Sequence, residues 1–217
     1  MDPGEWPRLQ ILGSEDRFTV RRVWCIGRNY LDHAKEMGDT GTKPPLVFAK
    51  NPMGLVPAGD GEVVHIMYPS QTDELHFEVE WVLAIGEGGR IIGSTVGLDM
   101  TRRDLQRSMK ERRGPWAIAK DFADSAPIGR LLLGTIPVDA SIRLSVDGEL
   151  RQSSNIHHMM WGAEALVARV NELCPLAPGD LIFTGTPAGV GPVEAGQKME
   201  AFIEGVGRLT VHVESRD

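Results

Sequence analysis

The sequence predicts an α+β fold in which strands dominate and helices are few. Glycine accounts for 25 and proline for 14 of the 217 residues, and most of them separate short apolar runs, which is typical of a strand-rich chain with many turns. Hydrophobic residues make up 41% of the chain, enough for one sizeable core. The chain has no internal repeat and no Pro- or Ser-rich linker. We therefore expect one domain over residues 1–217, with residues 1–18 as a short lead-in.

Strands are expected where short apolar or alternating runs end at turn residues. In the first half of the chain such runs cover residues 20–26, 46–50, 62–66 and 77–86, followed by a mostly extended segment at 91–100. Asn29 is a suitable N-cap for a short helix over residues 30–37. Thr101 is a suitable cap for a basic helix over residues 102–113, which ends at Gly114-Pro115.

The second half is expected to add two hairpins, a helix and a strand. Residues 142–152 form a hairpin with Asp147-Gly148 at its turn, because that dipeptide favours tight hairpin turns. Residues 158–173 have the spacing of an amphipathic helix. A strand at 179–187 runs into a Gly-rich turn, and residues 198–214 form a closing hairpin.

Composition excludes several functional classes. The net charge of −7 argues against a nucleic-acid partner, because phosphate recognition needs a basic surface. No run approaches the ~18 apolar residues of a membrane span, and the first ten residues lack the apolar core of a secretory signal. The two cysteines form no CxxC pair and no disulfide framework, so we expect a reducing, cytoplasmic location.

Two glutamates stand side by side where a strand enters the core. Residues 76–81, HFEVEW, alternate between polar and apolar, so Glu78 and Glu80 share one face, and the next four residues are apolar. Such a pair can stay in water, which is the commonest outcome, pair with Lys or Arg, or bind a divalent cation. Asp99, between two apolar residues, adds a third carboxylate. Three carboxylates would suit a hard cation such as Mg²⁺ or Mn²⁺.

Further polar residues have a spacing that suits chemistry, although each also has an ordinary structural explanation. His33 and Glu36 share a helix face, either as a general-base pair or as a surface pair. Lys120 follows an apolar run and is expected to point into a pocket. Arg103 and Gln106 share one side of the basic helix, which is either a solvated face or a site for a substrate carboxylate.

The polar motifs, taken together and in order, resemble the fumarylacetoacetate hydrolase family, in particular its compact single-domain acylpyruvate hydrolases. The matching segments are GRNYLDHAKEMG (27–38), HFEVEWVLAIG (76–86), GLDMTRRDLQ (97–106), PWAIAKDFADSAPIG (115–129), VDGELRQ (146–152) and GDLIFTGTPAGVG (179–191). The resemblance implies a rolled, mixed β-structure or sandwich with flanking helices, and a homodimer. It implies a single catalytic domain.

The resemblance also implies residue roles. Residues matching Glu78, Glu80 and Asp99 hold Mg²⁺ or Mn²⁺ in the family. Those matching His33 and Glu36 activate water. The substrate site is lined by residues matching Arg103, Gln106, Lys120 and Thr186, the last in the TGTP turn. His157 and His158 are candidates for the border of that site.

The implied reaction is hydrolysis of the C–C bond of a 2,4-dioxo acid, an acylpyruvate such as fumarylpyruvate, to pyruvate and a carboxylic acid. The same pocket would also suit oxaloacetate, which makes an oxaloacetate decarboxylase or tautomerase the alternative. A ligand-binding scaffold without turnover is a third hypothesis. The presence of both His33 and Glu36 favours hydrolysis, since a pure binder has no use for a water-activating pair.

Overall fold

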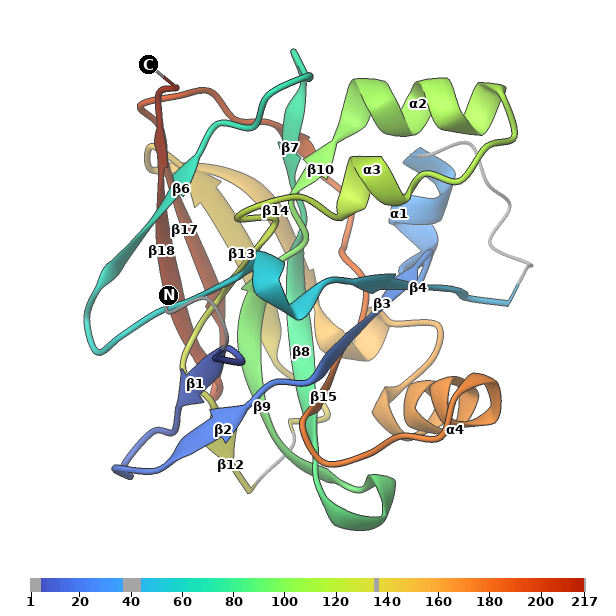
Figure 1. Cartoon of the computed structure of the whole chain (residues 1–217), viewed down its shortest axis with the longest axis vertical. Helices are drawn as coiled ribbons and strands as arrows, with labels where there is room; N and C mark the ends of the chain where they lie inside the picture. The colour runs from blue at the N-terminus through green and yellow to red at the C-terminus, as the bar shows by residue number, and fades with distance from the viewer. Residues whose placement is uncertain (1–4, 37–43, 135–136, 217) are drawn as a thin grey trace.

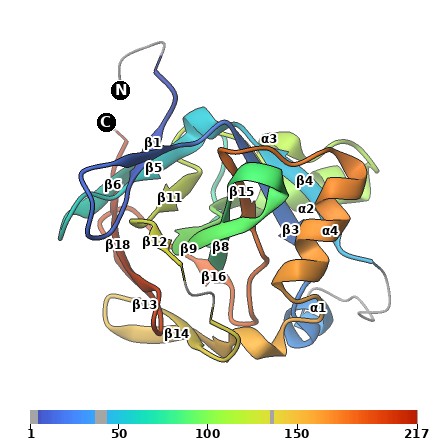
Figure 2. The same cartoon turned by 90° about the horizontal axis from the view of Figure 1, so that it is seen from below.

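Two mixed β-sheets hold most of the strands. The structure, a computed structural model, describes residues 5–36, 44–134 and 137–216. The α-helices of these residues lie on one side of the molecule, and the smaller of the two sheets lies on the opposite side (Figures 1 and 2). This is the strand-rich fold with few flanking helices that the sequence predicts.

The larger sheet contains the acidic strand at its centre. Its eight strands are β3 (Arg22–Gly27), β4 (Leu46–Lys50), β5 (Leu55–Pro57), β8 (Val79–Ile85), β9 (Ile91–Leu98), β11 (Ala126–Ile128), β12 (Leu132–Leu133) and β15 (Asp180–Phe183). Their order is β4-β3-β15-β8-β9-β11-β5, with β12 also paired to β9. The pairs β3–β15 and β5–β11 are parallel, and β8 is antiparallel to both of its neighbours.

The smaller sheet is built from the two predicted hairpins. Its strands are β6 (Val63–Met67), β13 (Ser141–Val146), β14 (Glu149–Asn155), β17 (Lys198–Ile203) and β18 (Gly207–Glu214), in the order β14-β13-β17-β18-β6. Strands β14 and β6 are the two edge strands, and β6 runs parallel to β18. At the turn between β13 and β14, Asp147 and Gly148 both have positive φ, 49° and 82°, as the predicted turn type requires.

The remaining elements are short. The small strands are β1 (Arg8–Gln10), β2 (Arg17–Thr19), β7 (Leu75–Phe77), β10 (Thr101–Arg102) and β16 (Gly191–Pro192). The α-helices are α1 (Leu31–Glu36), α2 (Arg103–Glu111), α3 (Ala117–Lys120) and α4 (Ala163–Leu173), and the 3₁₀ segments are Pro52–Gly54, Glu87–Gly89 and Ile156–His158. No helix among the described residues is long and apolar enough to cross a membrane.

Strand β8 is apolar on both faces because it separates two cores. Trp81 and Leu83 belong to the cluster between the two large sheets. Val82 and Ala84 belong to a second cluster on the other face of the larger sheet, with residues of β3, β15 and β1. A strand covered on both sides reads as a continuous apolar run. The buried charges at its start therefore sit at the edge of a closed interior.

The predicted strand 77–86 is broken at Glu78. Strand β7 leaves the larger sheet and pairs with β10 and β16 in a three-stranded sheet, whereas β8 begins at Val79. The break does not separate the glutamates, because Glu78 still accepts a backbone hydrogen bond from Asp99 N at 2.9 Å. Glu78 thus lies at the junction of two sheets, next to the end of β9.

Both predicted helix caps use their side chains for other contacts, and those cap predictions are wrong. Asn29 donates to Trp161 O and Thr184 O and accepts from Trp161 N, so it joins three distant segments. Thr101 lies in β10 and donates to Asp99 O, and Arg102 precedes α2 without a side-chain cap. Local cap preference is outweighed here by long-range hydrogen bonds.

Two boundaries differ from the predictions, and a third lies at the edge of the described residues. Helix α4 begins at Ala163 and not at residue 158, because 156–158 form a 3₁₀ turn and Met159 bridges to Tyr30. The lead-in carries the paired strands β1 and β2, with Leu9 buried in the second core. Helix α1 was predicted to reach residue 37, which lies outside the described residues.

Candidate active site

The predicted site residues meet in one pocket of about 200 Å³. It opens where β3, β4, β8 and β9 approach α1, α2 and α3. Of the predicted residues, the following line it: His33, Glu78, Glu80, Asp99, Arg103, Gln106, Lys120 and Thr186. Glu36 does not line the pocket, but it contacts His33 from behind. These residues are spread over more than 150 positions of the sequence, from His33 to Thr186, and the sheet order brings them together.

Three buried carboxylates form the floor of the pocket. Glu78 is 5% exposed, and Glu80 and Asp99 are each 1% exposed. One carboxylate oxygen of each lies within 4.8 Å of the others. Glu80 is the second residue of β8 and pairs with Gly97 of β9. Asp99 comes two residues after Gly97, so the two acids lie at the same end of the sheet. Burial of three acids at this spacing is unfavourable without compensating charge.

Two cations compensate Glu78 and Asp99. Lys120 Nζ donates to Glu78 Oε2 and Asp99 Oδ2, at 2.7 Å each. Arg103 Nη2 donates to Glu78 Oε1 at 2.5 Å. Sequence proximity gave no sign of this compensation, since Arg103 and Lys120 reach Glu78 across 25 and 42 residues.

Lys50, at the end of β4, is a third buried cation that sequence reasoning missed. Its Nζ lies 2.9 Å from Asp99 Oδ1, and it donates to the backbone carbonyls of Met100, Lys120 and Ser125. It thereby joins the end of β9 to α3. The sequence signal was of the same kind as for Lys120: Lys50 also follows an apolar run, LVFA.

The electrostatics separate the three acids. Burial alone would raise the pKa of Glu78, but the charges of Lys120 and Arg103 hold it well below its ordinary value. Burial raises the pKa of Glu80 well above its ordinary value, and the charges of Asp99 and Glu78 add to this. Burial opposes the ammonium of Lys120, yet Asp99 and Glu78 raise its pKa overall. Glu80 is therefore the carboxylate that the protein's own cations leave least compensated.

This imbalance fits a divalent cation. Among the described contacts, the hydrogen-bond partner of Glu80 is Gly185 N, at 2.8 Å from Oε2, and no ion pair links it to a Lys or Arg. A cation held by Glu78, Glu80 and Asp99 would supply the missing charge. Three oxygen donors are the ligands that Mg²⁺ and Mn²⁺ prefer, so the residues present fit the metal that the sequence predicts.

His33 and Glu36 form a hydrogen-bonded pair at the pocket wall. His33 is 8% exposed, and its Nδ1 lies 3.1 Å from Glu36 Oε2. The carboxylate of Glu36 also accepts from Gly189 N at 3.2 and 3.3 Å. Because Nδ1 donates its proton to the carboxylate, Nε2 of a neutral ring is the nitrogen left to accept one. The turn after β15 therefore fixes the dyad.

Arg103, Gln106 and Thr186 present hydrogen-bond donors. Gln106 Oε1 accepts from Arg103 Nη1 at 2.7 Å, which leaves the Gln106 amide NH₂. Thr186 Oγ1 accepts from Gln152 Nε2 at 2.8 Å, which leaves the hydroxyl proton. Arg103 keeps two of its five N–H groups after contacting His76, Gln106 and Glu78. A wall that offers donors suits a substrate anion.

Gln152 is a second residue that sequence reasoning missed. It lies on β14, is fully buried, and accepts from Val79 N at 3.0 Å while donating to Thr186 Oγ1 and Pro187 O. It therefore ties the acidic strand to the TGTP turn. The segment VDGELRQ (146–152) ends on this residue, but a glutamine in a polar strand gives no local sign of burial. Lys110 and Trp116 also line the pocket.

Three further histidines, His76, His157 and His158, do not line the pocket. His76 accepts from Arg103 Nε at 3.3 Å, the structural role expected of a histidine at a strand end. Burial and the charge of Arg103 lower its pKa to about 4. His157 lies 3.3 Å from Asp139, and neither it nor His158 lines the pocket. The 3₁₀ turn that carries these two candidate border residues is exposed at the surface and lies outside the pocket lining.

Comparison with known proteins gives one consistent family. Residues 22–214 match the family model for the C-terminal part of fumarylacetoacetate (FAA) hydrolase. A crystal structure of fumarylpyruvate hydrolase from Pseudomonas aeruginosa, in complex with Mn²⁺ and pyruvate, is 45% identical, with a TM-score of 0.97 over 100% of this chain and 99% of that one.

Two curated relatives have different activities. A mitochondrial oxaloacetate tautomerase of Arabidopsis thaliana is 37% identical over 208 residues, 90% of this chain and 92% of the relative. A fumarylpyruvate hydrolase of Ralstonia sp. is 35% identical over 187 residues, 81% of this chain and 95% of the relative.

Proposed function

The chain belongs to the fumarylacetoacetate hydrolase family, and we propose that it hydrolyses the C3–C4 bond of an acylpyruvate, with fumarylpyruvate as the first substrate to test. The products would be pyruvate and a carboxylic acid. The observation that carries the proposal is the His33–Glu36 pair beside the three buried carboxylates. The high similarity to a fumarylpyruvate hydrolase that binds Mn²⁺ and pyruvate supports the same substrate class.

Glu78, Glu80 and Asp99 would hold the divalent cation. When bound, Mg²⁺ or Mn²⁺ supplies a Lewis acid that favours the enolate of a 2-oxo acid. Lys120 already contacts two of these carboxylates and keeps them aligned. Its ammonium has three protons, and the two described hydrogen bonds use two of them. The third is the proton we assign to the oxyanion that develops at C4 of the substrate.

His33 is the proposed base for the attacking water. Glu36 holds the ring so that Nε2 accepts a proton, and the water oxygen forms a bond to C4. Collapse of the resulting tetrahedral species breaks the C3–C4 bond and leaves the electron pair on C3 as the enolate of pyruvate. The proton that His33 took from water is returned to C3, which completes pyruvate and restores the neutral base.

The donor wall orients the substrate. Arg103 and Thr186 are the proposed partners of its carboxylate groups, since each keeps free N–H or O–H donors after its described contacts. Gln106 adds its amide NH₂ beside Arg103. Because Arg103 also contacts Glu78, substrate binding and the position of the acidic cluster are linked.

A second candidate function is oxaloacetate tautomerase or decarboxylase. The observation that favours it is the 37% identity to an oxaloacetate tautomerase over nearly the whole chain. Oxaloacetate has the same carboxylate and 2-oxo groups as an acylpyruvate. Its decarboxylation gives the same enolate without an attacking water, so the donor wall and the carboxylates would serve both reactions.

A substrate panel separates the two candidates. Fumarylpyruvate, maleylpyruvate, acetylpyruvate and oxaloacetate are each incubated with the enzyme and Mg²⁺ or Mn²⁺, and both the loss of enol absorbance and the release of pyruvate are followed. The proposal requires at least one acylpyruvate to release pyruvate faster than oxaloacetate does. Rapid turnover of oxaloacetate alone would replace it with the second candidate.

A further inference from the structure

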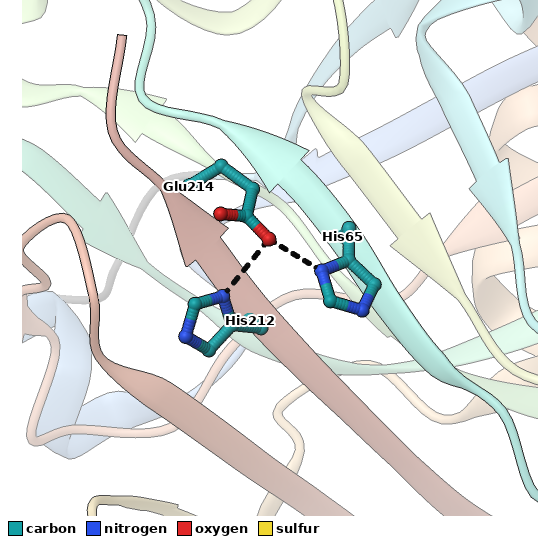
Figure 3. A group of neighbouring side chains, drawn as sticks. All are labelled: His65, His212 and Glu214. Atoms are coloured by element: carbon teal, nitrogen blue, oxygen red, sulfur yellow. Dashed lines mark hydrogen bonds and ion pairs between the residues drawn. The ribbon is translucent and has the colours of Figure 1, made fainter.

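A second cluster of metal-ligating side chains lies far from the pocket, on the outer face of the five-stranded sheet. His65 on β6 and His212 on β18 are direct partners in the parallel register. Glu214 follows two positions after His212 and so shares its face. Figure 3 shows both imidazole rings turned toward the Glu214 carboxylate. The proposed reaction uses none of these three residues.

The distances are those of a preformed ligand set. Glu214 Oε1 accepts from His65 Nδ1 at 2.6 Å and lies 3.3 Å from His212 Nδ1. One ligand atom of each residue lies within 4.8 Å of the others. A tetrahedral ion with bonds of ~2.0–2.1 Å separates its ligand atoms by about 3.4 Å. The three side chains would therefore move by less than about 1 Å to bind one.

We propose that His65, His212 and Glu214 form a Zn²⁺ site that joins β6 to β18. Two imidazoles and one carboxylate are a common zinc donor set, with water as the fourth ligand. The acidic cluster in the pocket has three oxygen donors and suits a harder cation. The chain thus has two sites of different metal preference.

The surroundings of the cluster are compatible with a cation. Glu214 accepts hydrogen bonds from the rings of both His65 and His212 and has no Lys or Arg ion-pair partner among the described residues. Lys198 of β17 is the register partner of His212, but its Nζ lies 3.6 Å from Glu200 Oε1, which offsets its charge. The His65 side chain is 60% exposed, so an ion reaches it without any opening of the sheet.

The site would anchor the edge of the sheet. Strand β6 has a neighbour on one side, β18, and an edge strand is held by a single ladder of hydrogen bonds. A metal bridge between the two strands adds a second link. Bound Zn²⁺ should therefore slow the opening of residues 63–67 more than that of the buried strands.

Equilibrium dialysis against Zn²⁺ in excess Mg²⁺ tests the proposal. The wild type should retain one Zn²⁺ per chain. His212→Ala and Glu214→Gln should each bind Zn²⁺ at least about tenfold more weakly, as expected when a ligand is lost. His157→Ala removes another exposed histidine beside a carboxylate and should bind like the wild type. Glu80→Gln alters the acidic cluster and should keep the zinc.

Hydrogen exchange gives a second readout. Zn²⁺ should slow amide exchange in residues 63–67 of the wild type and leave the exchange of His212→Ala unchanged. Equal zinc retention by the wild type and His212→Ala would overturn the proposal, as would loss of the zinc in Glu80→Gln. Failure of either kind leaves the proposed hydrolase reaction untouched, because that reaction uses other residues.

Discussion

His33 lines the pocket, and its Nδ1 lies beside the Glu36 carboxylate. Because we assign it to water activation, its removal should affect the steps that need water. General-base assistance contributes typically about 10²–10⁴-fold. We expect His33→Ala to reduce acylpyruvate hydrolysis by roughly that factor. Decarboxylation of oxaloacetate, if the enzyme performs it, should fall much less. Steady-state kinetics with both substrates measures the two losses in one variant.

The comparison has an internal control, because the metal ligands of the variant are intact. Calorimetric titration with Mn²⁺ should give the same affinity for His33→Ala as for the wild type. Equal losses in the two reactions would mean that His33 acts on the enolate step they share. The assignment of water activation would then have to be abandoned.

His76 links stability to pH. Its pKa is lowered to about 4 by burial and by Arg103, against an ordinary value of 6.5. Between these two values the unfolded chain takes up a proton that the folded chain does not, so stability falls as the pH is lowered from 6.5 to 4. His76→Gln keeps an acceptor for Arg103 but does not titrate. Urea midpoints at pH 7, 5.5 and 4.5 should therefore decline less steeply in this variant.

The exposed His157→Gln serves as the matched control and should retain the wild-type slope. If His76→Gln declines as steeply as the wild type, other groups carry the acid sensitivity. The low pKa of His76 would then make no measurable contribution to the pH dependence of stability.

At the scale of elements, one buried glutamine joins the hairpin β13–β14 to both halves of the site. Gln152→Leu would leave Val79 N and Thr186 Oγ1 without their partner. An unsatisfied buried donor costs about 1–3 kcal/mol, so we expect the free energy of unfolding to fall by that amount. The KM for an acylpyruvate should also rise, because Thr186 loses its fixed orientation. Gln197→Leu removes a glutamine whose hydrogen bonds are exposed to water, so it should lose less stability, and equal losses would exclude this explanation.

Elements whose pattern repeats over many residues were predictable. The hairpins at 142–152 and 198–214 and the doubly apolar strand β8 follow from alternation and turn residues, and the structure confirms them. The caps at Asn29 and Thr101 and the start of α4 were wrong. Asn29, for example, hydrogen-bonds to segments more than 100 residues away. A short stretch of sequence around the residue does not contain that information.

At the scale of the whole molecule, the residues of the pocket were predictable as types but not as a charge-balanced set. Lone acids on a strand face pointed to a cation, and the fold brings Glu78, Glu80 and Asp99 together. The cations that partly balance their charge lie on distant strands and helices. Lys50, beside Asp99, is the one that sequence reasoning missed. Their placement depends on the sheet order β4-β3-β15-β8-β9, which periodicity alone does not specify.

This partial balance predicts how the molecule responds to metal removal. Lys50, Lys120 and Arg103 compensate Asp99 and Glu78 without a metal, so EDTA should abolish turnover while the protein stays folded. A divalent cation such as Mn²⁺ that binds the folded state and not the unfolded state would contribute about 2.7 kcal/mol at 100 times its Kd. For a chain of this size that corresponds to a rise in Tm of roughly 5–11 °C.

Glu80 decides whether that rise comes from the acidic cluster. It is the carboxylate with no ion-pair partner among the described residues, so Glu80→Gln relieves a repulsion in the metal-free protein and removes a ligand from the metal-bound one. Its Tm in EDTA should equal or exceed that of the wild type, whereas its response to Mn²⁺ should largely vanish. Glu172→Gln, at an exposed position on α4, should respond like the wild type. A Glu80→Gln protein that gains as much Tm from Mn²⁺ as the wild type would show that the ion binds elsewhere.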